Sequence, residues 1–171
     1  LLAPLLAPHN PFDLASLSLM DSLLPPSWTG MGDPRYLLGT DDQGRDVLST
    51  ILYGSRISIA VGLASVAFAA VLGITLGLVA GYMGGAVDAV IMRVADVQLS
   101  FPAILIALLI DGTISGLTGG VNREETAFTV LVISIGLSFW VQYARTVRSS
   151  TLVERDKEYV QAARLIGLHP F

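Results

Sequence analysis

The chain has 171 residues, of which 53% are hydrophobic and only 14% charged, and its formal net charge is −4. These proportions are too apolar for a typical soluble domain, and the negative balance argues against nucleic acid as a partner. There is no cysteine, which excludes a disulfide framework and a thiolate metal site.

The first 56 residues hold no complete membrane span. Residues 1–8 are apolar but too short to cross a bilayer, so we interpret them as the end of a truncated first span. Residues 9–56 are rich in Pro, Gly and Asp, a mixture that favours turns over a packed core.

An acidic, glycine-bracketed turn lies at residues 38–48, Leu-Gly-Thr-Asp-Asp-Gln-Gly-Arg-Asp-Val-Leu. Asp42 or Asp46 could cap the helix that follows, and glycines permit unusual dihedral angles. The carboxylates could form a cation site, but a solvated turn with a local ion pair to Arg45 is the favoured interpretation, because the spacing differs from that of an EF-hand.

A first full span is predicted at residues 57–80, which carry no charge. At about 1.5 Å per residue this stretch would extend roughly 36 Å, enough to cross a hydrocarbon core of about 30 Å. Small residues recur there at every fourth position, forming a smooth stripe against which another backbone can pack closely. They are Ser65, Ala69, Gly73, Gly77 and Gly81.

A tight turn at residues 81–85 leads to a second predicted span at 87–110. Its uncharged part is too short to cross, so Arg93 and Asp96 must lie near its inner end. These two residues are three positions apart and can pair on one helix face, which would offset the cost of charge inside a membrane. A structural pair is favoured over a proton relay. Pro102 should bend the helix.

A Gly-rich polar loop is expected at residues 111–126, followed by a third span at 127–144. Trp140 and Tyr143 near its far end are interpreted as interfacial anchors. The sequence Thr-Leu-Val-Glu at 151–154 has the form of a capping box, which predicts a short helix over 152–166 that stops at Gly167.

The distribution of basic residues predicts the orientation. Residues 145–164 carry five basic side chains, whereas the loop at 111–126 carries one. Basic flanks lie on the cytoplasmic side, so residues 9–56 are expected to be extracytoplasmic. The chain is thus expected to be an all-α integral protein that crosses the inner or plasma membrane several times.

Three segments, in this order, resemble the dipeptide/oligopeptide/nickel branch of ABC importer permeases. The first is the turn at 38–48 with the residues after it, up to Ser58. The second is the pattern Asp-x-x-x-x-Arg-x-x-Asp-x-x-x-x-Phe-Pro from Asp88 to Pro102. The third is Tyr-Val-Gln-Ala-Ala-Arg-Leu-Ile-Gly at 159–167, which is similar to the E-A-A-x-x-x-G signature, with Gln161 at the position of the acid.

The resemblance implies a polytopic helical bundle of the permease type, with a transmembrane domain over 57–171 that ends in a partial cytoplasmic coupling loop at 145–171. In that loop a coupling helix would dock on the ATPase through Glu158, Tyr159, Gln161, Ala162, Ala163 and Gly167. The outer-face family motif would comprise Gly39, Thr40, Asp41, Asp42, Gly44, Arg45 and Asp46. Helix packing would depend on Gly73, Gly77 and Gly81, within this subunit or against a second permease chain.

The function implied is that of a transport subunit, not an enzyme, moving peptides or a similar small solute inward from an extracytoplasmic solute-binding protein. The expected partners are a second permease subunit, ABC ATPase subunits, that binding protein and membrane lipid. The chain has no phosphate-binding loop, so it should bind no cofactor, and ATP and Mg²⁺ would lie on the ATPase. The alternatives are a nickel or other solute branch, an ion-coupled carrier that uses Arg93 and Asp96, and a membrane scaffold.

Overall fold

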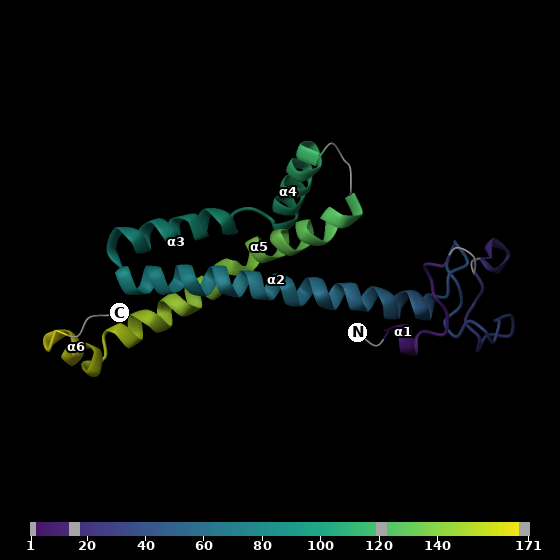
Figure 1. The fold of residues 1–171 in the computed structure, drawn as a ribbon, viewed down its shortest axis with the longest axis horizontal. Coiled ribbons are helices and arrows are strands. Elements are labelled where there is room, and N and C mark those ends of the chain that lie inside the picture. The colour runs from purple at the N-terminus through teal and green to yellow at the C-terminus, as the bar shows by residue number, and fades with distance from the viewer. Residues whose placement is uncertain (1–2, 14–17, 119–122, 168–171) are drawn as a thin grey trace. The chain divides into compact units, whose positions relative to one another are not determined.

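A computed structural model describes residues 3–13, 18–118 and 123–167. The chain divides into two compact units, Leu1–Ala60 and Val61–Phe171, and one long helix continues from the first into the second. Figure 1 shows the elements in chain order. They are α1 (Ala3–Leu6), the 3₁₀ helix η1 (Leu19–Asp21), α2 (Val47–Met83), α3 (Gly85–Leu99), α4 (Ala103–Thr118), α5 (Arg123–Arg155) and α6 (Glu158–Leu165).

Within the described residues, two helices are long and apolar enough to cross a membrane on their own. They are α2, with a mean hydropathy of 2.4, and the part of α5 over Thr126–Arg155, with a mean hydropathy of 1.7. The pair of α3 and α4 meets the same test only when taken together, which gives up to three candidate spans. The described residues outside these spans form the short helices α1, η1 and α6, turns, irregular chain and one isolated bridge, so the predicted all-α class is confirmed.

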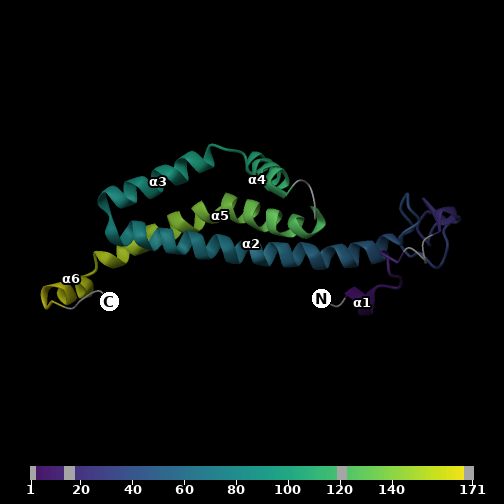
Figure 2. The same ribbon diagram turned by 45° about the horizontal axis from the view of Figure 1, so that its top comes forward.

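The small-residue stripe of α2 packs against α5, and the part of α2 in the second unit lies next to α5 in Figures 1 and 2. A Cβ atom added at Gly73 would lie 2.6 Å from the Cβ of Tyr143, and one at Gly77 would lie 3.0 Å from the Cα of Ala144. Ser65 and Ala69, on the same stripe, are buried. Of the two arrangements left open for this stripe, the structure shows packing within the chain, and any larger side chain there would push the helices apart.

The side chain of Trp140 lies in the helix packing, not at an interface. Only 4% of it is exposed, and it belongs to a buried cluster with Ala95 of α3 and Val141 and Ala144 of α5. The prediction of an interfacial anchor at Trp140 is wrong, because the side chain is buried in this cluster, against which Leu72 and Leu76 of α2 also pack.

The bend expected at Pro102 is present, but it is a break of 93° between α3 and α4 and not a kink within one helix. Proline lacks the N–H that would continue the backbone ladder, and it disfavours helical geometry in the residue before it. The amides of Ser100 and Phe101 close tight turns at the end of α3, and the Pro102 carbonyl accepts from Leu105 N at 2.9 Å to start α4.

The predicted loop at 111–126 is mostly helical. Helix α4 continues to Thr118 and α5 begins at Arg123, so only residues 119–122 lie outside the described ranges. A Cβ added at Gly112 or Gly116 would meet nothing within 4 Å, so packing within the chain does not require glycine at either position. The turn expected at residues 81–85 is narrower in the structure: α2 continues to Met83, α3 begins at Gly85, and Gly84, with a φ of 66°, joins them.

Candidate functional site

The outer-face motif builds the start of α2 in the first unit. Asp46 is 3% exposed, and its carboxylate accepts hydrogen bonds from the backbone N–H of Leu48 (3.3 Å) and Ser49 (3.2 Å) and from Ser49 Oγ (2.5 Å). These bonds satisfy amides that have no partner within the helix. Of the two capping candidates, Asp46 is therefore the cap.

The rest of the motif folds around Asp41. Its carboxylate accepts from the Arg45 amide at 2.9 Å, from Arg45 Nε at 2.7 Å and from the Gln43 amide at 2.9 Å. Burial alone would raise the pKa of Asp41, but the hydrogen bonds from Arg45 and Gln43 outweigh it and lower the pKa below its ordinary value. This geometry is the local ion pair that the sequence favoured. Asp42 is exposed.

Two glycines of the motif take the left-handed conformation that was expected, with φ of 80° at Gly39 and 74° at Gly44. At Gly39 a Cβ would also collide with the carbonyl oxygen of Leu24. That position therefore requires glycine for two independent reasons.

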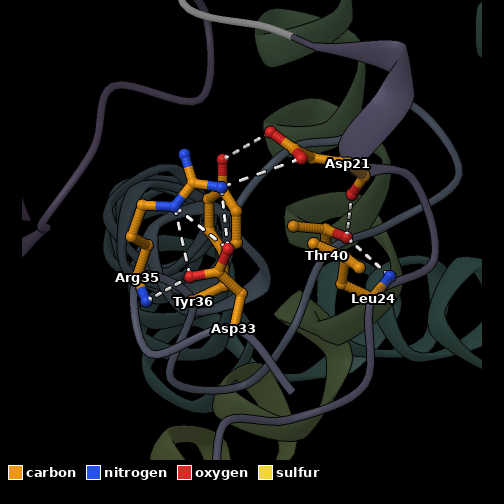
Figure 3. Close-up of polar contacts among 6 residues, drawn as sticks. All are labelled: Asp21, Leu24, Asp33, Arg35, Tyr36 and Thr40. Carbon is orange, nitrogen blue, oxygen red and sulfur yellow. Dashed lines mark hydrogen bonds and ion pairs between the residues drawn. The ribbon is translucent and has the colours of Figure 1, made fainter. Parts of the chain in front are cut away.

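The motif also binds the segment that precedes it, as Figure 3 shows. Thr40 Oγ1 donates to the Asp21 carbonyl and accepts from Leu24 N at 2.9 Å. The Tyr36 hydroxyl donates to Asp21 Oδ2 at 3.4 Å, and burial together with the Asp21 charge raises the pKa of Tyr36. Arg35 forms ion pairs with Asp33 at 2.7 Å and with Asp21 at 3.8 Å.

One participant was missed by the sequence reasoning. His9 Nδ1 lies 3.5 Å from Asp46 Oδ2, and its backbone N–H donates to Ser49 Oγ at 3.2 Å. No local signal could have found this contact, since His9 and the cap are far apart in the sequence.

A second group of polar contacts lies where α5 passes α3 and the α2–α3 turn. Arg148 forms a bidentate pair with Asp88, through Nε to Oδ1 and through Nη2 to Oδ2 at 2.5 Å. Arg155 Nη1 donates to the carbonyls of Gly81 (3.2 Å) and Tyr82 (3.3 Å) at the end of α2. Sequence spacing gave no indication of these contacts between helices.

The predicted pairing of Arg93 with Asp96 is wrong. Asp96 Oδ1 accepts from Arg145 Nη2 of α5 at 2.6 Å instead. A partner three residues away is within reach, but α5 packs along α3 and presents a guanidinium directly to the carboxylate.

The predicted capping box at 151–154 is also wrong, because α5 continues through it to Arg155 and α6 begins only at Glu158. Thr151 Oγ1 donates to the Val147 carbonyl at 2.7 Å, as hydroxyl residues do inside a helix. The packing of this turn against Gly81 favours continued helix.

The corner between α5 and α6, residues 154–161, is held by side chains. The Glu154 carboxylate accepts from Lys157 Nζ at 2.5 Å and from the Tyr159 hydroxyl at 2.7 Å, and these hydrogen bonds raise the pKa of both donors. Gln161 Nε2 donates to the Asp156 carbonyl at 3.0 Å. A glutamate at position 161 could not make that bond when ionised.

Helix α6 presents most of the predicted coupling residues to solvent. Glu158, Tyr159, Gln161 and Ala162 are exposed and Ala163 is partly buried. Gly167 follows the helix with a φ of 77°, as expected for a left-handed stop. The apolar side chains of Leu165 and Ile166 are largely exposed at the same end.

Comparisons with known proteins now identify the class. Residues 73–171 match the family described as the binding-protein-dependent transport system inner membrane component, and the chain belongs to this family. The matched region contains α3, α4, α5 and α6, together with the α2 stripe from Gly73 onward. This confirms the recognised family and agrees with the helical, apolar fold.

Three relatives show how widely the likeness extends. The chain is 36% identical to the dipeptide transport system permease protein DppC of Haemophilus influenzae, covering 98% of this chain and 52% of the relative. It is 35% identical to the nickel transport system permease protein NikC of Escherichia coli over 92% of the chain and 51% of the relative. It is 40% identical to the glutathione transport system permease protein GsiD of Pectobacterium atrosepticum over 76% of the chain and 40% of the relative. The chain thus spans about half the length, or less, of these relatives.

Proposed function

We propose that this chain is part of the permease subunit of an ATP-driven ABC importer that moves di- or oligopeptides, or a similar small solute, inward. The observation that carries the proposal is the short helix α6, set beyond a fixed corner at the end of α5, with its signature residues facing solvent. It lies within the region matched by the family of binding-protein-dependent permeases.

The membrane arrangement is part of the proposal. The three spans would lie within α2, the α3–α4 pair and α5, near residues 57–80, 87–110 and 127–144. The basic residues after the third span would place α6 in the cytoplasm. Residues 9–56, with the outer-face motif, would then face the side from which a solute-binding protein delivers its cargo, and residues 1–8 would end an earlier span.

Coupling would depend on the surface of α6. A groove on an ATPase subunit could bury Tyr159, Leu165 and Ile166, which are now largely exposed, in the way that grooves take up the apolar face of a helix. Ala162 and Ala163 would allow close approach, and Glu158, Gln161 and Gly167 complete the proposed contact. ATP and Mg²⁺ would be bound by the ATPase, and a second permease chain would complete the path.

The solute is the finer part of the proposal. Di- and oligopeptides are favoured because several relatives are dipeptide permeases, including that of Haemophilus influenzae. The relatives named for nickel and glutathione keep those solutes as alternatives.

Affinity purification of the full-length permease tests the coupling role. In the unchanged protein, we expect ATP-hydrolysing chains to co-purify in detergent. Ala162→Arg should reduce their recovery at least about tenfold, which corresponds to about 1.4 kcal/mol, because a long charged side chain would separate the two surfaces. Met31→Arg, on an exposed apolar residue of the other unit, is the control and should have no effect. Undiminished recovery with Ala162→Arg would refute the proposed contact.

A further inference from the structure

Two arginines at the end of α5 hold the α2–α3 turn on both sides of Gly84. Arg148 pairs with Asp88 in the first turn of α3, and Arg155 donates to the last carbonyls of α2. These side chains are shielded, with 30% of Arg148, 17% of Asp88 and 28% of Arg155 exposed. One helix thus contacts both of the helices that meet at the turn.

Each contact matches the electrostatics of the helix end that it meets. A carboxylate in the first turn of α3 is favoured by the helix dipole, and the planar guanidinium of Arg148 can bind both of its oxygens at once. The last carbonyls of α2 lack partners within that helix, and the Arg155 guanidinium supplies a cationic donor to them.

Beneath these contacts the backbones of α2 and α5 pack too closely for the two helices to slide past each other. A Cβ added at Gly81 would lie 2.7 Å from the Cβ of Thr151, which stands between the two arginines in α5. Closely packed surfaces of this kind shift as units and do not deform gradually. The corner to α6 follows directly after Arg155 and is braced by Glu154.

We propose that Arg148 and Arg155 are positioning residues that make the α2–α3 turn move together with α6. A displacement of α6 by the ATPase would then reach α2 and α3 directly, in addition to its path along α5. This inference rests on the proposed function, because it assumes that α6 is the element that the ATPase displaces.

Distance measurements between spin labels test it in the full-length permease purified with its ATPase chains. Cysteines replace Met83, beside the turn, and Val160, a residue of α6 outside the proposed ATPase contact. Met83 is exposed and Val160 is partly exposed, and the present sequence has no cysteine of its own. Distances are compared without nucleotide and with MgATP plus vanadate. In the doubly labelled parent we expect a shift of less than about 2 Å, since the two sites move as one unit.

The variant Arg148→Gln with Arg155→Gln should keep the nucleotide-free distance and shift by more than about 2 Å when MgATP and vanadate are added. A purely structural role would alter both states alike. Arg145→Gln is the matched control, because its pair with Asp96 also joins α5 to α3 but is about half exposed on both sides, and it should behave as the parent. If the glutamine variant does not fold, Arg148→Lys with Arg155→Lys is used instead. Lysine keeps the positive charge but lacks the planar guanidinium with its paired donors, so we expect a smaller shift in the label distance.

Two results obtained with the ATPase still bound would overturn this inference and leave the proposed function standing. They are a shift in the label distance of more than about 2 Å in the parent, or no such shift in the variant with both arginines replaced. If the labelled parent and the unlabelled permease both fail to co-purify with an ATPase, the proposed function fails, and the inference fails with it.

Discussion

Two polar corners of this chain, the outer-face motif before α2 and the corner between α5 and α6, are built differently. At the outer-face motif, Asp46 and Thr40 are buried and bind backbone groups, so the fold supplies their partners. At the α5–α6 corner, Glu154, Lys157 and Tyr159 bind one another's side chains near the surface. Buried polar groups are costly to leave unpaired, whereas exposed ion pairs contribute little. The first corner should therefore be sensitive to single substitutions, and the second should tolerate them structurally.

The largest effect is expected at Gly39. Gly39→Ala places a side chain on a residue with φ of 80° and against the carbonyl of Leu24, so it should lower the stability of the first unit by about 1–3 kcal/mol. Hydrogen exchange of residues 21–46 in the full-length protein measures this. Gly30→Ala, where nothing lies within 4 Å, is the control, and equal exchange in the two variants would contradict the prediction.

The next effect is expected at the helix cap. Asp46→Ala removes the acceptor for the Leu48 and Ser49 amides and should cost about 0.5–2 kcal/mol. Faster hydrogen exchange at the start of α2 is the readout. Asp42→Ala, at an exposed neighbour, should leave that exchange rate unchanged. A larger change in exchange with Asp42→Ala than with Asp46→Ala would show that Asp46 is not the cap.

Asp41 and Lys157, one residue from each corner, should lose their contributions to stability at opposite ends of the pH scale. The lowered pKa of Asp41 means that its contribution is fully present above the ordinary value of 3.8 and is lost as the pH falls through the lower, folded value. The raised pKa of Lys157 means that its contribution is present below 10.5 and is lost as the pH rises through the folded value. After correction for the intrinsic exchange rate, protection of the amides at 40–46 should fall in acid as Asp41 is protonated, and Asp41→Asn should reduce that dependence; an unchanged acid response in the variant would contradict it.

The smallest effect is expected at Gln161. Gln161→Glu removes the donor to the Asp156 carbonyl, and because the site is exposed the loss should be at or below about 0.5–1.5 kcal/mol. Mobility of a spin label at Leu165 should rise slightly. Gln161→Ala should give the same increase, so a rigid corner in both variants would show that this bond contributes nothing.

The sequence predicted what short-range patterns encode. The four-residue period of small residues located the α2–α5 packing, and the glycines at 39 and 44 marked positions with positive φ. Prediction from the sequence failed where a contact depends on a residue far away in the chain. Asp88 and Arg148 are 60 residues apart, Asp96 pairs across helices, and a neighbouring helix overrides the local capping signal at Thr151.

Motif resemblance placed the coupling residues on and just after one short helix. In the structure Glu158 to Ala163 lie on α6, and Gly167 follows it. Their corner depends on Glu154, which the sequence assigned to a capping box, because no pattern showed that α5 would continue through it. The contact of these residues with an ATPase stays a prediction.

The 93° break between α3 and α4 has a consequence for where solvent lies. Backbone amides and carbonyls that leave a helix find no substitute partners in hydrocarbon, so irregular chain at that depth is tolerated only beside protein or a water-filled path. If this pair of helices crosses the bilayer, residues 100–102 must face away from the lipid tails. The proline would then determine which side of the bundle is kept free of acyl chains.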